Sequence, residues 1–207
     1  MSCLGPQREV APQSWILASA SPRRRDLLRA AHQCFDCEPS DVEESLRPGE
    51  RALDCALRIA RSKAREVSAR RPGRWVLAAD TIVIVDGEAF GKPRDAADAA
   101  RMLQRLSGRG HEVATAFVLL DGLGKVFAAR VVRTDVVFRP LDAGEIAAYA
   151  ATGEPFDKAG AYPLQGAGAG FVTELRGSRS NVIGLPMDEV EDALRAAHLW
   201  TSRRRAP

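Results

Sequence analysis

The chain has 207 residues, of which 45% are hydrophobic and 28% are charged, a balance typical of a globular protein with one sizeable core. The 30 lysines and arginines exceed the 27 aspartates and glutamates by a net charge of only +3, which argues against a dedicated nucleic-acid binder. No apolar run approaches the roughly 20 residues of a membrane span, and residues 1–13 lack the hydrophobic stretch of a signal peptide, so we expect a cytoplasmic protein without membrane partners.

Short apolar runs alternate with segments of helical spacing, which predicts a mixed α/β fold with antiparallel strands in its middle. In chain order, the first half is predicted to contain a strand at 15–18, a helix at 23–31, a strand at 33–38, an acidic loop at 40–45, a helix at 50–70 and a strand at 74–85 that ends in a turn at 86–87. The second half is predicted to contain a helix at 96–106, strands at 111–120 and 125–138, a helix at 143–151, glycine-rich loop and short strand at 153–170, a strand at 171–175, a loop at 176–186 and a helix at 187–197.

The cysteines are too few for a disulfide scaffold in a chain of this size. Cys34 and Cys37 form a C-x-x-C pair, but zinc sites usually need a second pair of ligands, and Cys3 and Cys55 are single and distant. On a strand, residues three apart point to opposite faces, which is poor geometry for shared ligation. We therefore predict reduced thiols rather than a metal site.

Two glycine-rich stretches come close to nucleotide-binding motifs without matching them. Residues 87–93 have three residues where a phosphate loop needs four between its glycines, and a proline follows Lys92 where that loop needs Ser or Thr. In 166–170, the third glycine of a dinucleotide fingerprint is replaced by Phe171, and the preceding strand and following helix are missing. Neither a P-loop ATPase nor a dehydrogenase is supported.

The start of the first predicted helix is suited to binding an anion. Ser21 fits the N-cap position and Pro22 the first helical position, so the free N–H groups of the first turn point outward. Three arginines follow at 23–25, which is the unfavourable sign for the helix dipole unless an anion offsets it. The segment is therefore either a basic surface helix or a polyphosphate site.

Asp80 interrupts an otherwise apolar strand, where an unpaired buried carboxylate would be costly. It is either a structural residue paired with a nearby arginine, or a metal ligand or a base that deprotonates water. Glu43 and Glu44, with Lys63 and Lys92, would complete a set suited to hydrolysing a polyphosphate. In such a set the acids hold Mg²⁺ and activate water, while the cations neutralise charge on the phosphates. This requires that the fold bring them together.

Five blocks of sequence point to one family: 17–24, 79–81, 91–93, 152–162 and 177–186. Together they resemble the Maf-like nucleoside triphosphate pyrophosphatases, in the family's order. The resemblance implies a single domain over 14–200, with 1–13 and 201–207 as flexible termini. It also implies a mixed α/β sheet with flanking helices and a deep central cleft, related to the inosine triphosphate pyrophosphatase fold. The implied activity is hydrolysis of a nucleoside triphosphate to the monophosphate and pyrophosphate with Mg²⁺ or Mn²⁺, and a homodimer is a family-level expectation.

The resemblance also assigns roles to individual residues. Asp80 matches the proton acceptor, and Glu44 best matches the acidic loop position, with Glu43 as a close competitor. Asp80 and Glu44 are therefore the expected metal ligands. The other matched residues are the lysines of the cleft and the phosphate-binding helix start: Lys63, Lys92, Ser21, Arg23 and Arg24.

Substrate choice divides the family into a dTTP/UTP branch and a branch that prefers 7-methyl-GTP. Arg23, Thr81 and Gln165 carry the residue types of the pyrimidine branch at the matching positions. An amide can accept from the N3–H of uracil or thymine while donating to O4, a match that a purine does not present in the same way. Pro163 stands where this branch often has glycine, which leaves the ranking among UTP, dTTP and modified pyrimidines open.

Two alternatives to a pyrimidine triphosphatase remain. One is the 7-methyl-GTP branch, against which Gln165 and Arg23 argue. The other is a nucleotide-sensing regulator without turnover, because Maf-like proteins are associated with inhibition of septum formation and cell division. Asp80 together with the lysines favours turnover, since binding alone does not require a base.

Overall fold

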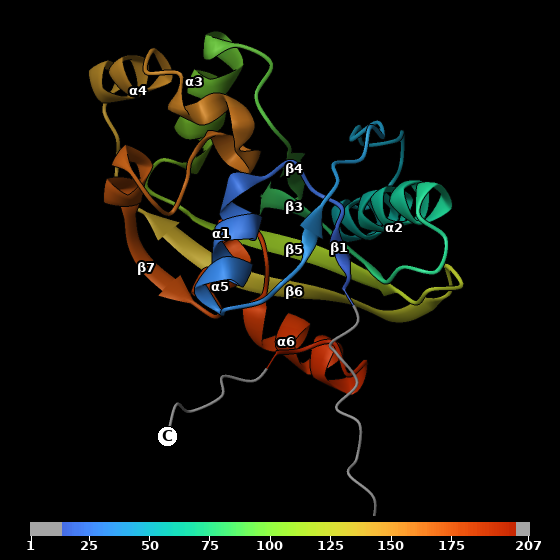
Figure 1. Cartoon of the computed structure of the whole chain (residues 1–207). Helices are drawn as coiled ribbons and strands as arrows, with labels where there is room; N and C mark the ends of the chain where they lie inside the picture. Colours follow the sequence, from blue (N-terminus) through green and yellow to red (C-terminus); the bar gives the residue numbers. More distant parts are fainter. Residues whose placement is uncertain (1–13, 202–207) are drawn as a thin grey trace, which may run out of the picture.

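A seven-stranded sheet organises residues 14–201, the part of the chain that the computed structural model describes (Figure 1). Six strands follow the order β2-β1-β3-β5-β6-β7, and β4 pairs with β3 beside them. The contacts among β1, β2 and β3 are parallel, whereas those of β4, β5, β6 and β7 are antiparallel. The strands are β1 (Ile16–Leu17), β2 (Asp36–Cys37), β3 (Val76–Val85), β4 (Glu88–Phe90), β5 (Gly110–Leu120), β6 (Val126–Phe138) and β7 (Val172–Arg176).

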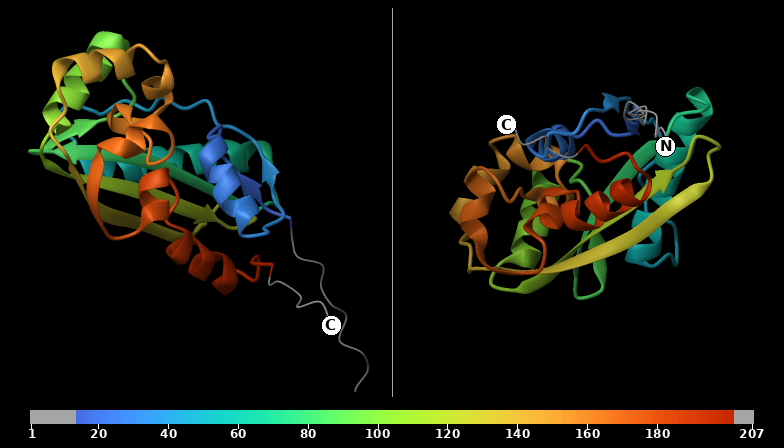
Figure 2. Two further views of the ribbon diagram at one scale, coloured as in Figure 1. Left: turned by 90° about the vertical axis from the view of Figure 1, so that its left-hand side faces the viewer. Right: turned by 60° about the horizontal axis from the view of Figure 1, so that its bottom comes forward.

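Helices cover both faces of the sheet and gather at one end of its long strands (Figure 2). Helix α2 lies on one face, α1 and α6 lie on the opposite face, and α3 and α4 pack with the 3₁₀ turns at one end. The helices are α1 (Pro22–Ala30), α2 (Ala52–Arg70), α3 (Ala96–Leu106), α4 (Ala143–Ala150), α5 (Arg179–Ile183) and α6 (Met187–Ala196), and the 3₁₀ turns are η1 (Glu154–Asp157), η2 (Ala159–Ala161) and η3 (Ala167–Phe171). No helix within 14–201 is long and apolar enough to cross a membrane.

The central strand β3 is buried on both faces because helices cover the sheet on each side. This explains its nearly continuous apolar run, which an alternating strand with one wet face would not show. Helix α2 meets the strand through a stripe of small buried side chains at Ala56, Ala60 and Ala64. Small residues at this spacing share one face and allow close approach. The neighbouring Lys63 can therefore reach the middle of β3.

The predicted mixed α/β fold is confirmed, and most predicted helices and strands occur within a few residues of their expected bounds. The loop prediction for 176–186 was wrong in part, because it contains the short helix α5. Ser178 begins this helix by accepting a hydrogen bond from Asn181 N. The short strand expected within 153–170 is absent there. Left-handed backbone at Gly153, Gly160 and Gly166 breaks the extended conformation and leaves 3₁₀ turns.

Strand β4 is an element that the sequence analysis missed. Asp86 (φ 49°) and Gly87 (φ 78°) both have positive φ, the conformation of a tight hairpin turn that folds β4 back onto β3. Of the predicted termini, 1–13 and 202–207 lie outside the described residues, as does Cys3. Thr201 is described, and its backbone N–H and C=O both bond to the side chain of Gln33.

Candidate active site

A cleft of about 770 Å³ is lined by the start of α1, the loop before α2, strand β3 and the turns around η1. All the residues that the sequence analysis singled out for the site line this one cleft: Ser21, Arg23, Arg24, Glu44, Lys63, Asp80, Thr81, Lys92 and Gln165. The fold therefore brings together acids and cations that are far apart in the sequence. Their individual roles stay predictions.

The cleft contains a lysine shared by two carboxylates. Lys63 Nζ lies 2.7 Å from Asp80 Oδ1 and 2.6 Å from Glu44 Oε1. The side chains of Lys63 and Asp80 are only 7% and 11% exposed, so this is a buried pair, whereas Glu44 is 37% exposed. The structural interpretation of Asp80 supposed a nearby arginine as its partner, but the direct partner is a lysine.

Burial and nearby charges shift the pKa values of Asp80 and Glu44 in opposite directions. Burial raises the pKa of Asp80, and the nearby Lys63 and Arg24 offset this only in part. Burial would also raise the pKa of Glu44, but Lys63 and Lys92 outweigh it and lower the pKa to about 2. Glu44 is thus ionised at neutral pH, while Asp80 is shifted toward the pKa that a general base requires.

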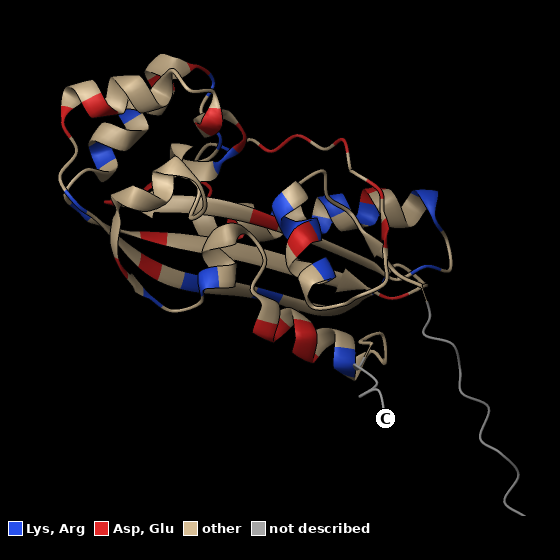
Figure 3. Cartoon of the chain, turned by 60° about the vertical axis from the view of Figure 1, so that its left-hand side comes forward, with Lys and Arg blue, Asp and Glu red and all other residues tan. Residues whose placement is uncertain are grey.

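Glu44 is held in the cleft by lysines of two other segments, Lys63 of α2 and Lys92. Lys92, just after β4, lies 2.7 Å from Glu44 Oε2. Glu43 instead accepts a hydrogen bond from Ser45, so the geometry favours Glu44 over Glu43 at the acidic loop position. Arg58 of α2 donates to the carbonyl of Ser45 at 2.8 Å and also binds the Glu50 side chain, which ties the loop to the helix. Figure 3 shows acidic positions along this coil and basic positions on α1 and α2.

The opposite wall of the cleft is the start of α1. Ser21 occupies the N-cap position, as predicted, but its side chain makes no capping hydrogen bond. Arg24 is buried and donates to three oxygens: Nε to Gly184 O at 2.7 Å, Nη1 to Ser19 Oγ at 3.3 Å and Nη2 to Thr81 Oγ1 at 3.0 Å. Burial lowers the pKa of Arg24, although a guanidinium stays protonated in proteins.

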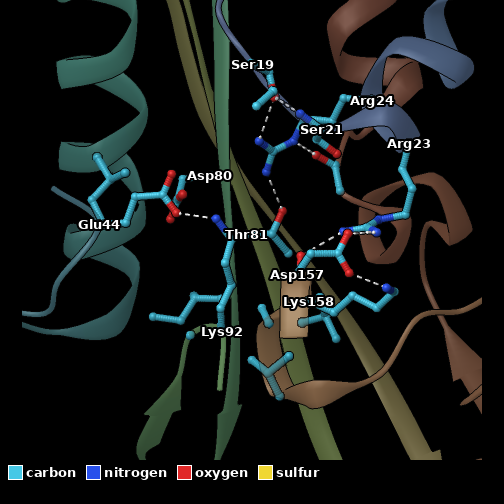
Figure 4. A pocket seen from close by; sticks show the side chains of 18 of the residues that line it. Ser19, Ser21, Arg23, Arg24, Glu44, Asp80, Thr81, Lys92, Asp157 and Lys158 are labelled. Carbon is cyan, nitrogen blue, oxygen red and sulfur yellow. Dashed lines mark hydrogen bonds and ion pairs between the residues drawn. The ribbon is translucent and has the colours of Figure 1, made fainter. Parts of the chain in front are cut away.

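Arg23 bridges α1 and η1. Its Nη1 lies 2.9 Å from Asp157 Oδ2, and its Nη2 donates to Asp157 O at 3.1 Å. Asp157 also pairs with Lys158, whose Nζ donates to Glu154 O at 2.6 Å. Figure 4 shows Arg23 with Asp157 on one side of the pocket and Glu44 with Asp80 on the other. A polyphosphate that binds Arg23 would therefore either share this arginine with Asp157 or displace Asp157 from it.

Thr81 and Gln165, the two remaining predicted contacts, differ in their freedom to bind. Thr81 already accepts from Arg24 and lies 2.9 Å from the hydroxyl of Thr115. Gln165 is exposed at the cleft, and its amide has no partner among the described residues. Gln165 is thus available to a ligand without first breaking a contact.

Comparison with known proteins identifies the family. The family model described as "Maf-like protein" matches residues 14–197. The chain belongs to the Maf-like family. A relative from Citrifermentans bemidjiense, named dTTP/UTP pyrophosphatase, is 51% identical over 182 residues, covering 88% of this chain and 94% of the relative. A protein of the same name from Anaeromyxobacter dehalogenans is 52% identical over 185 residues, covering 88% and 93%. A solved structure of a HAM1 protein from Coxiella burnetii aligns with a TM-score of 0.47 and 14% identity, covering 90% of this chain and 94% of that one.

The carboxylates of this Maf-like protein can be compared with the ligand sets that metals require. Among residues 14–201, no group of three or more His, Cys, Asp or Glu side chains could hold a metal ion. Asp80 and Glu44 nevertheless converge on a single cation, the Lys63 ammonium. Mg²⁺ is often bound by one or two carboxylates together with substrate phosphates and water. The donor set therefore fits a divalent ion whose coordination the substrate completes.

Three residues of the Maf-like site received no individual role in the sequence analysis: Ser19, Asp157 and Lys158. Ser19 and Asp157 matter because they hold the arginines of α1. Both lie within the blocks that resemble the family, so the family pattern contained a signal for them. Spacing contained none, because Asp157 meets Arg23 across 134 residues of sequence.

Proposed function

We propose that this Maf-like protein hydrolyses dTTP and UTP to the nucleoside monophosphate and pyrophosphate with the help of Mg²⁺ or Mn²⁺. The observation that carries the proposal is a buried carboxylate, Asp80, in a cleft that also contains Lys63, Arg23, Arg24 and Lys92. Relatives that share about half of their residues with this chain are named dTTP/UTP pyrophosphatases, which supports both the reaction and the pyrimidine preference.

The phosphates are expected to bind at the start of α1. The free N–H groups of its first turn and the positive end of the helix dipole favour an anion there. Ser21 offers an uncommitted hydroxyl, and Arg23 and Arg24 add cations on the same wall. Lys63 and Lys92 on the facing wall would neutralise charge that builds on the phosphates during the reaction.

Asp80 is the proposed base. Its Oδ1 accepts from Lys63, which leaves Oδ2 without a partner among the described residues and able to accept a proton from water. The water oxygen forms a bond to the α-phosphorus, the bond from that phosphorus to the bridging oxygen of the β-phosphate breaks, and pyrophosphate leaves with the bonding electrons. When bound, a divalent ion held by Asp80 and Glu44 supplies charge neutralisation on the phosphate oxygens.

Gln165 is the residue proposed to recognise the nucleobase of the substrate. Its carbonyl oxygen can accept from the N3–H of uracil or thymine while its amide donates to O4, and neither group has another partner among the described residues. A site built to satisfy such a pair discriminates against a base that leaves the amide unpaired. The preference for dTTP and UTP over purine triphosphates is expected to follow from this contact.

The test is pyrophosphate release from UTP, dTTP, CTP, GTP and 7-methyl-GTP with Mg²⁺ or Mn²⁺, for the wild type and Asp80→Asn. Release from UTP and dTTP that is lost in the variant is the expected result. Turnover of 7-methyl-GTP alone would overturn the specificity. Nucleotide binding without any turnover would overturn the activity in favour of a regulatory binder. Full activity of Asp80→Asn would refute the assigned base.

A further inference from the structure

Behind the start of α1, where the phosphates are expected to bind, five residues form a closed ring of hydrogen bonds. Arg24 Nε donates to Gly184 O at 2.7 Å, and Gly184 N donates to Asn181 O at 3.0 Å. Thr115 Oγ1 donates to the same Asn181 carbonyl at 2.9 Å, and it lies 2.9 Å from Thr81 Oγ1. The ring closes where Arg24 Nη2 donates to Thr81 Oγ1 at 3.0 Å.

The direction of each bond in the ring follows from counting protons. A hydroxyl has one proton, and that of Thr115 is used on the carbonyl of Asn181. Thr81 must therefore donate to Thr115, and its oxygen accepts from Arg24. The Thr81 proton is thus directed into the protein and away from a ligand in the cleft.

The ring is anchored in the sheet by residues that do not line the cleft. Thr115 and Asn181 are 0% exposed. Asn181 Nδ2 donates to Val113 O at 3.0 Å and to Thr134 Oγ1 at 2.9 Å, which ties α5 to strands β5 and β6. The side-chain oxygen of Asn181, Oδ1, is buried without a partner among the described residues, which costs stability, whereas the paired groups of the network hold their members in one arrangement. The network therefore contributes more to fixing geometry than to stability.

Of the ring members that line the cleft, Arg24, Thr81 and Gly184, only Arg24 carries a charge. The ring holds its guanidinium by two edges, Nε and Nη2, so the plane of the group is set and its remaining N–H groups have a defined direction. We propose that Thr115 and Asn181 are positioning residues, which orient Arg24 toward the phosphates of the substrate. This inference rests on the proposed function, because the proposed function identifies the anion bound by Arg24 as the triphosphate of the substrate.

Two substitutions at Thr115 separate positioning from structure. Thr115→Val keeps the shape of the side chain and removes the hydroxyl, whereas Thr115→Ser keeps the hydroxyl and removes a buried methyl group. We expect Thr115→Val to weaken binding of inorganic triphosphate about tenfold, since one misdirected contact to a charged group is of this size. Thr115→Ser should bind like the wild type but melt at a lower temperature. If the role of Thr115 were only structural, the variant with the lower melting temperature would also be the one that binds triphosphate more weakly.

Calorimetric titration with inorganic triphosphate and thermal unfolding provide these two measurements. The same titration in an Arg24→Lys background should show no further loss from Thr115→Val, because the residue acts through Arg24. Wild-type affinity in Thr115→Val, or losses of affinity that follow the losses of stability in both variants, would overturn the proposal.

A readout without ligand separates this inference from the proposed function. The ¹H–¹⁵N signal of Arg24 Nε and the rate of rotation about its Nε–Cζ bond report how firmly the guanidinium is held. We expect faster rotation in Thr115→Val and wild-type rotation in Thr115→Ser. Unchanged rotation in Thr115→Val would overturn the ring's role even if the enzyme is active. Faster rotation in a protein that hydrolyses no nucleotide would support the ring while the proposed function fails.

Discussion

Lys63→Met removes the cation that forms ion pairs with both Asp80 and Glu44, and it keeps most of the buried apolar stem of the lysine. The Lys63 and Asp80 side chains are 7% and 11% exposed, so the variant leaves a carboxylate buried beside a methionine. Removing one partner of a buried pair costs about 3–5 kcal/mol of unfolding free energy. Glu44 is 37% exposed and keeps Lys92, so it adds little to this loss. We expect a loss near the lower end, about 3 kcal/mol, and a fall in Tm of roughly 6–12 °C for a chain of this size.

The loss should depend on pH with a defined sign. Burial already raises the pKa of Asp80, and removing Lys63 raises it further. A carboxyl whose pKa is higher in the folded than in the unfolded state favours folding while it is protonated. This contribution is present at acid pH and is lost as the pH rises through the folded pKa. The difference between variant and wild type should therefore grow from acid to neutral pH.

Urea unfolding at several pH values measures both quantities, with Lys63→Met/Asp80→Asn as the matched control. The double variant has no buried charge at this pair, so it should regain most of the lost stability and lose the pH dependence. Lys125→Met, at an exposed lysine, should change little. If Lys63→Met unfolds at the wild-type midpoint, or if the double variant is no more stable than the single one, the reasoning is refuted.

Three further predictions concern groups around the site. Burial lowers the pKa of His111 to about 4 from its ordinary 6.5, so stability present above pH 6.5 should be lost as the pH falls toward 4, and His111→Gln should flatten this curve in urea titrations. Arg58→Gln should speed hydrogen exchange of the loop that carries Glu44, because Arg58 donates to the backbone of that loop at 2.8 Å. Gly168→Ala should lower the Tm measured by calorimetry by several degrees, since a Cβ there would lie 2.7 Å from Pro163 Cδ and overpacking costs about 1–3 kcal/mol.

Each of these predictions has a contrary outcome. A wild type that keeps its full stability from pH 6.5 down to 4 would contradict the buried neutral state of His111. Arg70→Gln is the control for the loop, since Arg70 contacts this segment at its start, at Pro39 O and the Glu38 side chain. Equal exchange in both arginine variants would argue against a specific role of Arg58. Gly170→Ala is the control for Gly168, because a Cβ at 170 has no atom within 4 Å, and equal Tm values for the two alanine variants would argue against overpacking at Gly168.

Local sequence was sufficient to predict the elements on which the site is built. Helix α3 has the bounds predicted from sequence, 96–106, and β3 stands out as an apolar run long enough for a buried strand. These features depend on periodicity and capping, which act over a few residues. Helix α5 escaped prediction because five residues are too few to show a helical period.

Charged residues at positions where they are normally unfavourable also indicated the location of the site from sequence. Asp80 inside an apolar strand and basic residues at a helix start are local violations, and both line the cleft. The residues with which they pair could be identified only from the tertiary structure. Asp80 meets Lys63 because a stripe of alanines lets α2 approach β3, and Arg23 meets Asp157 across 134 residues.

The hydrogen-bond ring around Arg24 joins helices α1 and α5, strands β3 and β5 and the turn after α5, so its existence depends on strand register and helix packing together. Sequence periodicity determines which face of an element is buried. The three-dimensional packing decides which polar atoms meet there, because a shift of one residue in a strand turns every side chain to the opposite face.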